Sequence, residues 1–483
     1  MKLAVVGGGS TYTPELIDGF ARLRDVLPLT ELTLIDPAED RLELIGPLAR
    51  RIFARAGHPG RITWTGDLDR GVDGADAVLL QLRVGGQAAR AQDESWPLEC
   101  GCVGQETTGA GGLAKALRTV PVVLDIAERV RRRAPEAWIV DFTNPVGIVT
   151  RALLTAGHRA VGLCNVAIGF QRKFAALLGV SPAEVALDHV GLNHLTWERG
   201  VRLGGPDGED VLPRLLAEHG DAIAADLRMP RSLLDRLGVV PSYYLRYFYQ
   251  HDAVVAEQRG ATSRAAEVAA IESRLLELYA DPELDTKPEL LAKRGGAYYS
   301  EAAVDLTSAL LRPGAPGGEG DGTAGGNPAP GHGAGPGAGA DGADGAAVTA
   351  GGAAAGSGTA AGGGAVTGGG AVTGRSAGEV LVVNTFNHGT LPFLPDDAVI
   401  EVPAVVGAHG ATPLPQAPLD PLYAGLVAQV TGYEHLALEA ALHGGRNRVF
   451  RALLAHPLIG QTEYADRLTD SLLAHNREHL PWA

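Results

Sequence analysis

The feature that most constrains the fold is a run of three glycines, Gly7–Gly9, directly after the apolar run Leu3–Val6. A segment of helical periodicity, Pro14–Leu27, follows a few residues later. A glycine-rich turn between a strand and a helix lets the backbone approach a pyrophosphate, and the helix N-terminus supplies N–H donors for it. The segment therefore predicts a dinucleotide-binding turn, although Tyr12 stands where the strict pattern needs glycine. The residues expected to bind the cofactor here are Gly7, Gly8, Gly9, Ser10 and Thr11.

Short apolar runs alternate with longer helical segments over the first third of the chain. This alternation is typical of βαβ units with a parallel sheet, and six strands make a complete dinucleotide-binding fold. The expected strands are Leu3–Val6, Leu32–Asp36, Ile62–Thr65, Ala77–Leu82, Trp138–Asp141 and Ala160–Cys164, and the expected helices are Pro14–Leu27, Asp40–Ala56, Leu113–Arg133 and Val146–Ala156.

Asp36 stands at the end of the second expected strand. A carboxylate there can accept hydrogen bonds from a ribose 2′-hydroxyl and would repel a 2′-phosphate. Asp36 is therefore a further cofactor-binding candidate and favours NAD over NADP. The alternative is a glycine-rich turn that binds no ligand.

The expected fold class is α/β, with an N-terminal Rossmann-like, doubly wound parallel sheet followed by a mixed α+β, mostly helical C-terminal domain. We expect residues 1–168 to bind NAD and residues 169–483 to bind substrate and metal. Between Pro313 and Gly374 lie 25 of the 66 glycines, in low-complexity sequence that cannot bury enough apolar area to offset its ordering entropy. A disordered Gly/Ala-rich insertion is therefore predicted at residues 313–376.

Composition excludes several classes of protein. The net charge of −15 disfavours nucleic acid as a partner, because binding to it depends on Lys and Arg at the phosphates. The sequence has no apolar run long enough for a membrane span and no signal-peptide pattern, so we expect a cytoplasmic protein without a membrane partner. Three cysteines at uneven spacing are expected to stay reduced.

Polar residues follow two of the expected strands at the edge where ligands bind in open α/β sheets. Asn144 follows the fifth strand, Cys164 and Asn165 close the sixth, and His194 lies about 30 residues on. A thiolate and an imidazole can form half of a metal site, for which ligand softness favours zinc first, although the spacing leaves the metal open. Alternatively, Cys164 is a buried small hydrophobe and His194 an ordinary hydrogen-bonded histidine.

Arg90 and Arg264 are candidate anion-binding residues. Arg90 follows the fourth expected strand at the same sheet edge. The segment Tyr243–Tyr249 is the densest aromatic stretch of the chain and could also be a core helix.

Taken together, these segments resemble glycoside hydrolase family 4, the NAD-dependent glycosidases, and within it the 6-phospho-β-glucosidases. The resemblance covers nearly the whole chain except the glycine tract. The matching segments are residues 7–15, 83–86 with Arg90, 104–107, 111–121, Asp141–Pro145, Gly162–Val166, Gly191–His194, Tyr244–Tyr247 and Leu394–Pro403.

The resemblance implies a cofactor pair, NAD and Mn²⁺, which replaces zinc as the expected metal. It implies that Cys164 and His194 are the metal ligands and that Tyr244 is the catalytic base. It further implies a homodimer or homotetramer that acts on a phosphorylated disaccharide or aryl glucoside. The substrate-binding residues that it implies are Arg90, Asn144, Asn165 and Arg264.

The implied reaction is hydrolysis of a 6-phospho-β-glucoside through transient oxidation at C3, C2 deprotonation by Tyr244, aglycone elimination and addition of water. Since a phenol is a weak base at neutral pH, we expect the metal or Arg264 to lower its pKa. The asparagine at position 165 is similar to that of the β-specific members. At position 167 the family usually has proline, and this chain has Ala167. The alternatives are a family glycosidase for α-linked or unphosphorylated substrates, a lactate/malate-type dehydrogenase, and a catalytically silent nucleotide sensor.

Overall fold

The computed structural model describes residues 1–296, 298–312 and 378–483, so the insertion predicted at 313–376 lies outside the described residues. The N-terminal part contains six parallel strands in the order β3-β2-β1-β4-β5-β6. This is the strand order of a complete dinucleotide-binding fold, and the predicted Rossmann-like, doubly wound sheet is confirmed. The strands are β1 (Lys2–Val6), β2 (Glu31–Ile35), β3 (Arg61–Thr65), β4 (Ala77–Leu80), β5 (Trp138–Asp141) and β6 (Ala160–Gly162).

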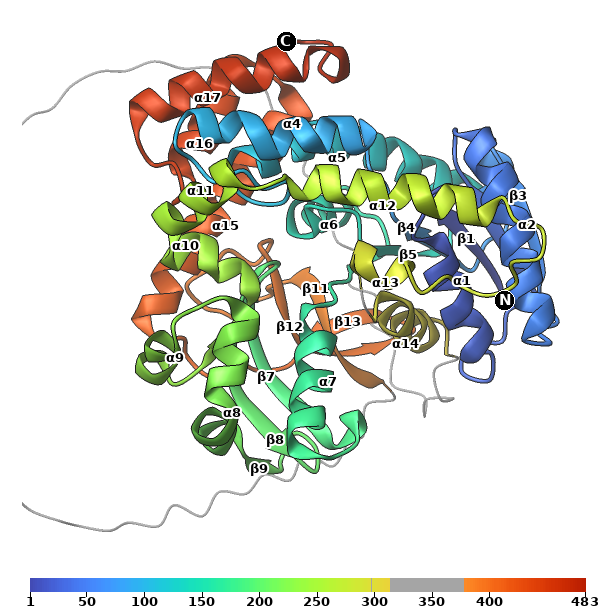
Figure 1. Cartoon of the computed structure of the whole chain (residues 1–483), viewed down its shortest axis with the longest axis horizontal. Coiled ribbons are helices and arrows are strands. Elements are labelled where there is room, and N and C mark those ends of the chain that lie inside the picture. The colour runs from blue at the N-terminus through green and yellow to red at the C-terminus, as the bar shows by residue number, and fades with distance from the viewer. Residues whose placement is uncertain (297, 313–377) are drawn as a thin grey trace, which may run out of the picture. The chain divides into compact units, whose positions relative to one another are not determined.

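Helices lie on both sides of this sheet (Figure 1). Two hydrophobic cores lie on its opposite faces. Successive side chains of a strand point to opposite faces, so Leu3 and Val5 enter one core while Ala4 and Val6 enter the other. One core includes residues of α1 (Thr13–Arg22) and α2 (Glu39–Arg55), and the other includes residues of α5 (Gly109–Arg133) and α6 (Val146–Thr155).

Two helices of this part were not expected, α3 (Leu68–Val72) and α4 (Gly86–Glu99). The buried residues of α4 are Asp93, Glu94, Trp96 and Pro97, so no apolar stripe marks it in the sequence. The first helix also ends earlier than expected, at Arg22 instead of Leu27.

Beyond β6 the same sheet continues with antiparallel strands in the order β6-β11-β12-β7-β8-β10. The hairpin β7–β8 lies in a region expected to be rich in helix, and His194 sits in its turn. The sheet crosses the expected boundary between residues 168 and 169 without interruption, and that division stays a prediction. These strands are β7 (Val185–Leu192), β8 (Leu195–Leu203), β9 (Glu209–Asp210), β10 (Val240–Pro241), β11 (Glu379–Phe386), β12 (Val399–Gly407) and β13 (Gly410–Pro413).

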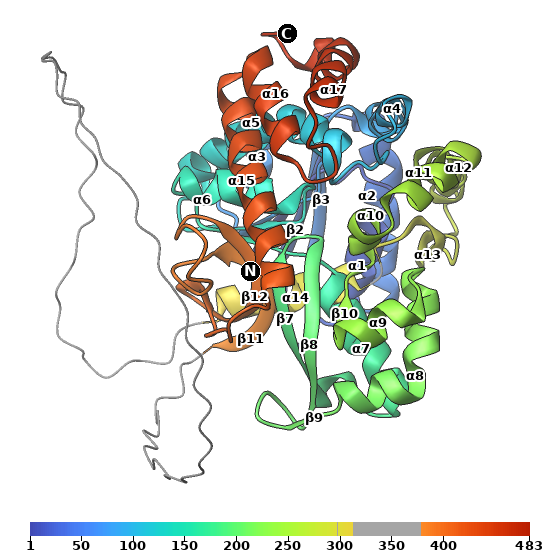
Figure 2. The same ribbon diagram turned by 90° about the vertical axis from the view of Figure 1, so that its left-hand side faces the viewer.

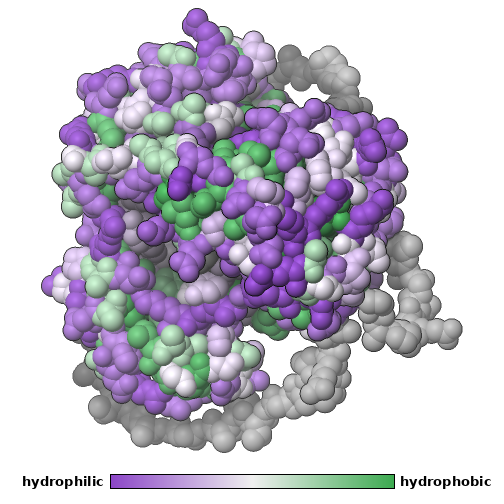
Figure 3. Space-filling view, turned by 45° about the vertical axis from the view of Figure 1, so that its right-hand side comes forward, coloured by the Kyte–Doolittle hydropathy of each residue, from purple (hydrophilic) through white to green (hydrophobic). Residues whose placement is uncertain are grey.

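The rest of the described chain is mostly helical, as predicted. The three C-terminal helices pack against α5, and α14 packs against α1 (Figure 2). Hydrophilic residues predominate on the face shown in Figure 3, in keeping with the net charge of −15. Among the described helices, none has the length and apolarity that crossing a membrane would require. The helices are α7 (Val166–Leu178), α8 (Leu212–Leu227), α9 (Arg231–Leu237), α10 (Arg246–Tyr249), α11 (His251–Gly260), α12 (Arg264–Tyr279), α13 (Leu291–Arg294), α14 (Tyr299–Leu311), α15 (Pro421–His443), α16 (Arg446–Ala455) and α17 (Thr462–His475).

Candidate active site

A pocket of about 1550 Å³ lies where the carboxyl ends of the parallel strands meet α12 and the segment around Tyr244. Pockets for a single small ligand usually have about 300–1,000 Å³, so this one has room for two ligands side by side. Most of the site residues expected from the sequence line it, whereas Gly8, Gly9, Thr11 and Cys164 lie beneath its surface. The expected residues that line the pocket are Gly7, Ser10, Asp36, Arg90, Asn144, Asn165, His194, Tyr244 and Arg264.

The glycines of the first turn pack too closely against neighbouring backbone and side-chain atoms to carry side chains of their own. A Cβ on Gly7, where φ is +89°, would lie 2.7 Å from the Gln81 carbonyl oxygen. A Cβ on Gly9 would lie 2.8 Å from the carboxyl carbon of Asp36. The Asp36 carboxylate accepts hydrogen bonds from the backbone N–H of Gly9 (3.0 Å) and Ala38 (2.9 Å). These contacts fix the turn and the carboxylate relative to each other.

Thr11 does not face the pocket. Its hydroxyl donates to Glu272 at 3.0 Å and accepts from Arg294 Nε at 2.8 Å, and its carbonyl accepts from the Tyr279 hydroxyl at 2.7 Å. Thr11 therefore ties the glycine turn to α12 and α13, which lie far away in the sequence.

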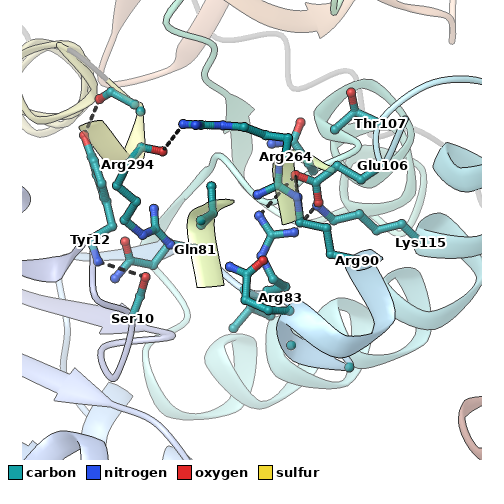
Figure 4. A pocket seen from close by; sticks show the side chains of 18 of the residues that line it. Ser10, Tyr12, Gln81, Arg83, Arg90, Glu106, Thr107, Lys115, Arg264 and Arg294 are labelled. Carbon is teal, nitrogen blue, oxygen red and sulfur yellow. Dashed lines mark hydrogen bonds and ion pairs between the residues drawn. The ribbon is translucent and has the colours of Figure 1, made fainter. Parts of the chain in front are cut away.

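Glu106 lies at the centre of three cationic side chains (Figure 4). Lys115 Nζ is 2.7 Å and Arg90 Nε 3.2 Å from its carboxylate, and Arg83 forms a third ion pair. Burial alone would raise the pKa of Glu106, but the charges of Lys115 and Arg83 hold it well below its usual range. Burial, with the nearby charge of Arg83, also lowers the pKa of Lys115 to about 8.

The sequence predicts no role for Glu106, Arg83 or Lys115, although all three line the pocket. The polar residues at 104–107, between two helices, were the one feature of the sequence that could have indicated a site there.

His194 and Tyr244 lie against each other, with ring centroids 3.6 Å apart and planes only 5° from parallel. His194 adopts a positive φ of 64° in the β7–β8 turn, and its Nδ1 lies 3.1 Å from the Thr107 hydroxyl. Burial lowers the pKa of His194 to about 4. The imidazole is therefore neutral at pH 7, which is the form that binds metals.

Cys164 follows β6 and is buried next to this ring pair. Burial and the nearby Glu401 raise the pKa of its thiol, while hydrogen bonds from the Val166 backbone N–H and the Asn193 side chain oppose that rise. Within the described ranges no three Cys, His, Asp or Glu side chains converge as a metal site. Cys164 and His194 therefore offer one thiol, which a bound metal would deprotonate, and one imidazole, a donor pair that suits a divalent transition metal with open coordination positions.

Asn144 offers a polar atom to the pocket that it lines. In the part of the chain that the structure describes, its Oδ1 is buried and has no hydrogen-bond partner. A buried acceptor of this kind is costly unless a ligand or water satisfies it. Asn165 also lines the pocket, as the residue before α7.

The environment of Tyr244 differs from the expectation. Burial raises its pKa well above the usual value, and Cys164, Tyr247 and Glu106 add to the rise. Arg264 does not offset it, because its side chain is 45% exposed and pairs with Glu267 at 3.0 Å. It also donates to the carbonyl oxygens of Lys293 and Arg294. Arg264 is therefore not the group that lowers the pKa of Tyr244, and the expectation that a metal ion lowers it stays a prediction.

Comparison with known proteins matches nearly the whole chain to one family. A model described as "Family 4 glycosyl hydrolase" matches residues 2–180, and the model of its C-terminal domain matches residues 189–315 and 371–459. A probable 6-phospho-beta-glucosidase of Bacillus subtilis is 33% identical over 100% of this chain and 97% of its own. A phospho-alpha-glucosidase of Clostridium acetobutylicum is 26% identical over 99% of this chain and 98% of its own.

A solved structure shows the same arrangement of the chain. The 6-phospho-beta glucosidase of Thermotoga maritima, solved with NAD and glucose-6-phosphate, has a TM-score of 0.81 and 30% identity, with 99% of both chains covered. Another structure of that enzyme contains manganese, NAD+ and glucose-6-phosphate and has a TM-score of 0.79 and 29% identity, again with 99% of both chains covered.

Proposed function

Because the chain belongs to family 4 of the glycosyl hydrolases, we propose that it hydrolyses 6-phospho-β-glucosides with NAD and a divalent metal ion, Mn²⁺, as cofactors. The observation that carries the proposal is the stacked pair of His194 and Tyr244, next to Cys164, in a pocket that continues to the glycine turn. The names of relatives support the β-linkage, since the B. subtilis β-glucosidase is 33% and the C. acetobutylicum α-glucosidase 26% identical to this chain.

The described residues fit both cofactors. Gly7, Gly8, Gly9, Ser10 and Asp36 would hold NAD, because the turn has room only for glycines and presents the aspartate to a ribose. Cys164 and His194 would hold the metal. When bound, NAD supplies a hydride acceptor for the sugar C3, and the metal polarises the sugar oxygens as a Lewis acid.

The protein's own residues bind the sugar and move its C2 proton. Tyr244 would take that proton as a phenolate. Because burial and Glu106 favour the neutral phenol, a bound metal ion would have to supply the positive charge that stabilises the phenolate. The stacking of Tyr244 on His194 keeps the base next to the metal ligand.

The same pocket fits a phosphorylated sugar. Asn144 would accept a hydrogen bond from a sugar hydroxyl through its unpaired Oδ1, and Asn165 lines the same pocket. Arg90 and Arg264 would hold the anionic substrate, together with Arg83 and Lys115 around Glu106.

A panel of chromogenic substrates tests the proposal: a 6-phospho-β-glucoside, its α-anomer and the unphosphorylated β-glucoside, each with NAD and Mn²⁺. We expect turnover of the 6-phospho-β-glucoside alone, its loss with a chelator and its recovery with Mn²⁺. A Cys164→Ser variant should lose the metal-dependent activity.

Three outcomes would contradict the proposal. Turnover of only the α-anomer or only the unphosphorylated glucoside would give the chain another specificity within the family. Accumulation of NADH during turnover, seen by absorbance, would indicate a dehydrogenase instead, because a hydrolase of this kind returns the cofactor to its oxidised form.

A further inference from the structure

A cluster of three charged side chains lies behind the pocket without lining it. His189 on β7, Glu198 on β8 and Glu401 on β12 have side chains that are 0%, 0% and 1% exposed. His189 Nδ1 lies 2.6 Å from Glu198 and its Nε2 3.1 Å from Glu401. Burial opposes the charged imidazole, but Glu198 and Glu401 outweigh it and raise the pKa of His189 to about 10. His189 therefore donates to both carboxylates.

Glu401 is the member of this cluster that contacts Asn193, the residue before His194. Its Oε2 accepts hydrogen bonds from the side-chain amides of Asn193 and Asn384, each at 2.9 Å. Together with His189, three donors surround one carboxylate, so its position is well determined.

The sheet places Glu401 between the two strand ends that carry the metal-ligand candidates. In the register of the sheet, Glu401 pairs with Asn384 and with Gly191, and Asn384 pairs with Gly162. Cys164 stands two residues after Gly162, and His194 stands three residues after Gly191. The row that contains Glu401 thus joins the two strands that Cys164 and His194 follow.

Asn193 connects Glu401 to both ligands. It precedes His194 in the chain, its amide donates to Glu401, and its side chain also forms a hydrogen bond with the Cys164 thiol. A side chain bound to Glu401 on one side and to Cys164 on the other fixes the turn that presents His194.

We infer that Glu401 is a positioning residue for metal binding, which acts through Asn193 on Cys164 and His194. This inference rests on the proposed function, since it requires a metal at that pair. Mutation of a residue that hydrogen-bonds to a metal ligand and orients it commonly lowers the metal affinity by about 10- to 100-fold. A cluster that only stabilised the fold would change stability and leave metal affinity alone.

The test measures the dissociation constant of Mn²⁺ for the free enzyme, from the electron paramagnetic resonance signal of unbound Mn²⁺. In Glu401→Gln, the new amide group must face at least one of the donors around it. We expect the dissociation constant to rise about 10- to 100-fold, with NAD binding unchanged.

The matched control is Asp93→Asn. Asp93 forms an ion pair with Arg118 at 2.6 Å, and both side chains are 1% exposed. Neither residue lines the pocket. This variant should lose stability and bind Mn²⁺ as tightly as the wild type.

Asn193→Ala is a second test. It removes the side chain that joins Glu401 to Cys164, while His189 remains paired with Glu401. It should also weaken Mn²⁺ binding, including in the case that Glu401→Gln does not fold. Unchanged affinity in Asn193→Ala, or in a folded Glu401→Gln, would overturn the inference. A wild-type enzyme that binds no Mn²⁺ would instead show that the proposed metal site is wrong.

Discussion

At the scale of single residues, Glu434 on α15 is a carboxyl group whose burial affects stability. It is 7% exposed, and burial raises its pKa to about 8, with Arg151 acting in the opposite direction. The folded protein therefore keeps this proton at neutral pH, whereas the unfolded chain releases it near the ordinary value of about 4.3.

This difference predicts a pH-dependent loss of stability. Between the unfolded and folded pKa values the native state binds more protons, so the free energy of unfolding falls as pH rises, by up to about 1.4 kcal/mol per pH unit. Glu434→Gln removes the titration. We expect the variant to gain stability over the wild type between about pH 5.5 and about pH 7.5, measured by urea unfolding at several pH values.

The exposed Glu439 on the same helix provides the control, because its side chain is 43% exposed. Glu439→Gln should follow the wild-type pH dependence. If Glu434→Gln also followed it over this interval, Glu434 would be ionised in the folded protein and the prediction would be wrong.

Residue identity allowed part of the site to be predicted from the sequence. Cys164, His194 and Tyr244 are chemically distinctive groups at expected strand ends or in a dense aromatic segment, and the structure brings His194 and Tyr244 into contact. A carboxylate is common, so its role depends on its neighbours. Glu401 meets His189 across 212 positions of sequence, a contact that no local pattern reveals.

At the scale of secondary-structure elements, α12 lines the pocket along most of its length, from Arg264 to Leu276. It begins with Arg264 and carries Glu272, which accepts hydrogen bonds from Thr11 (3.0 Å), Gln87 (3.1 Å) and Arg294 (2.9 Å). The helix therefore holds the glycine turn through the Glu272 carboxylate and the Tyr279 hydroxyl, both of which contact Thr11.

Glu272→Gln should weaken NAD binding, because the glycine turn loses a charged hydrogen-bond acceptor. The turn is then less ordered in the free protein, and ordering it on binding costs part of the binding free energy. Hydrogen bonds to charged groups contribute about 1.5–3 kcal/mol, and since glutamine keeps one acceptor we expect a loss of about 10-fold in affinity. Calorimetric titration with NAD measures it. Glu277→Gln, exposed on the same helix, should bind NAD normally, and equal affinities of the two variants would contradict the prediction.

Elements with strong periodicity could be predicted, and those without it could not. All six parallel strands were expected, because each is a short apolar run between helical segments. The helix α4 was missed since half of its buried residues are the acidic Asp93 and Glu94. The hairpin β7–β8 contains buried His189 and Glu198, which interrupt the alternation that marks a strand.

At the scale of the whole molecule, the described ends on either side of the glycine tract lie close together. Arg312 and Glu379 form an ion pair with a distance of 3.1 Å. The C-terminal family model also matches residues 189–315 and 371–459 and passes over the residues between them. A much shorter segment than the glycine tract could therefore link Arg312 to Glu379.

Replacing residues 314–376 with about six Gly and Ser residues, which can span about 20 Å, should preserve the fold and the hydrolysis of the 6-phospho-β-glucoside. Thermal unfolding and the chromogenic assay measure the two properties. A variant that folds but lacks activity would show that the tract contributes to catalysis.

The fold class could be predicted because three features of the first third of the chain indicate the same fold: the glycine turn, the alternation of strands and helices, and the position of Asp36. The continuous sheet could not, since β11 and β12 join β6 and β7 from more than 200 residues away. The expected oligomeric state and location in the cell remain predictions.

The central claim is that Tyr244 removes the C2 proton of a 6-phospho-β-glucoside. The most direct measurement is hydrolysis in D₂O with NAD and Mn²⁺, followed by nuclear magnetic resonance of the glucose 6-phosphate formed. We expect deuterium at C2 of the product, and a rate that falls about 10²- to 10⁴-fold in Tyr244→Phe. Product that keeps hydrogen at C2 would contradict the account.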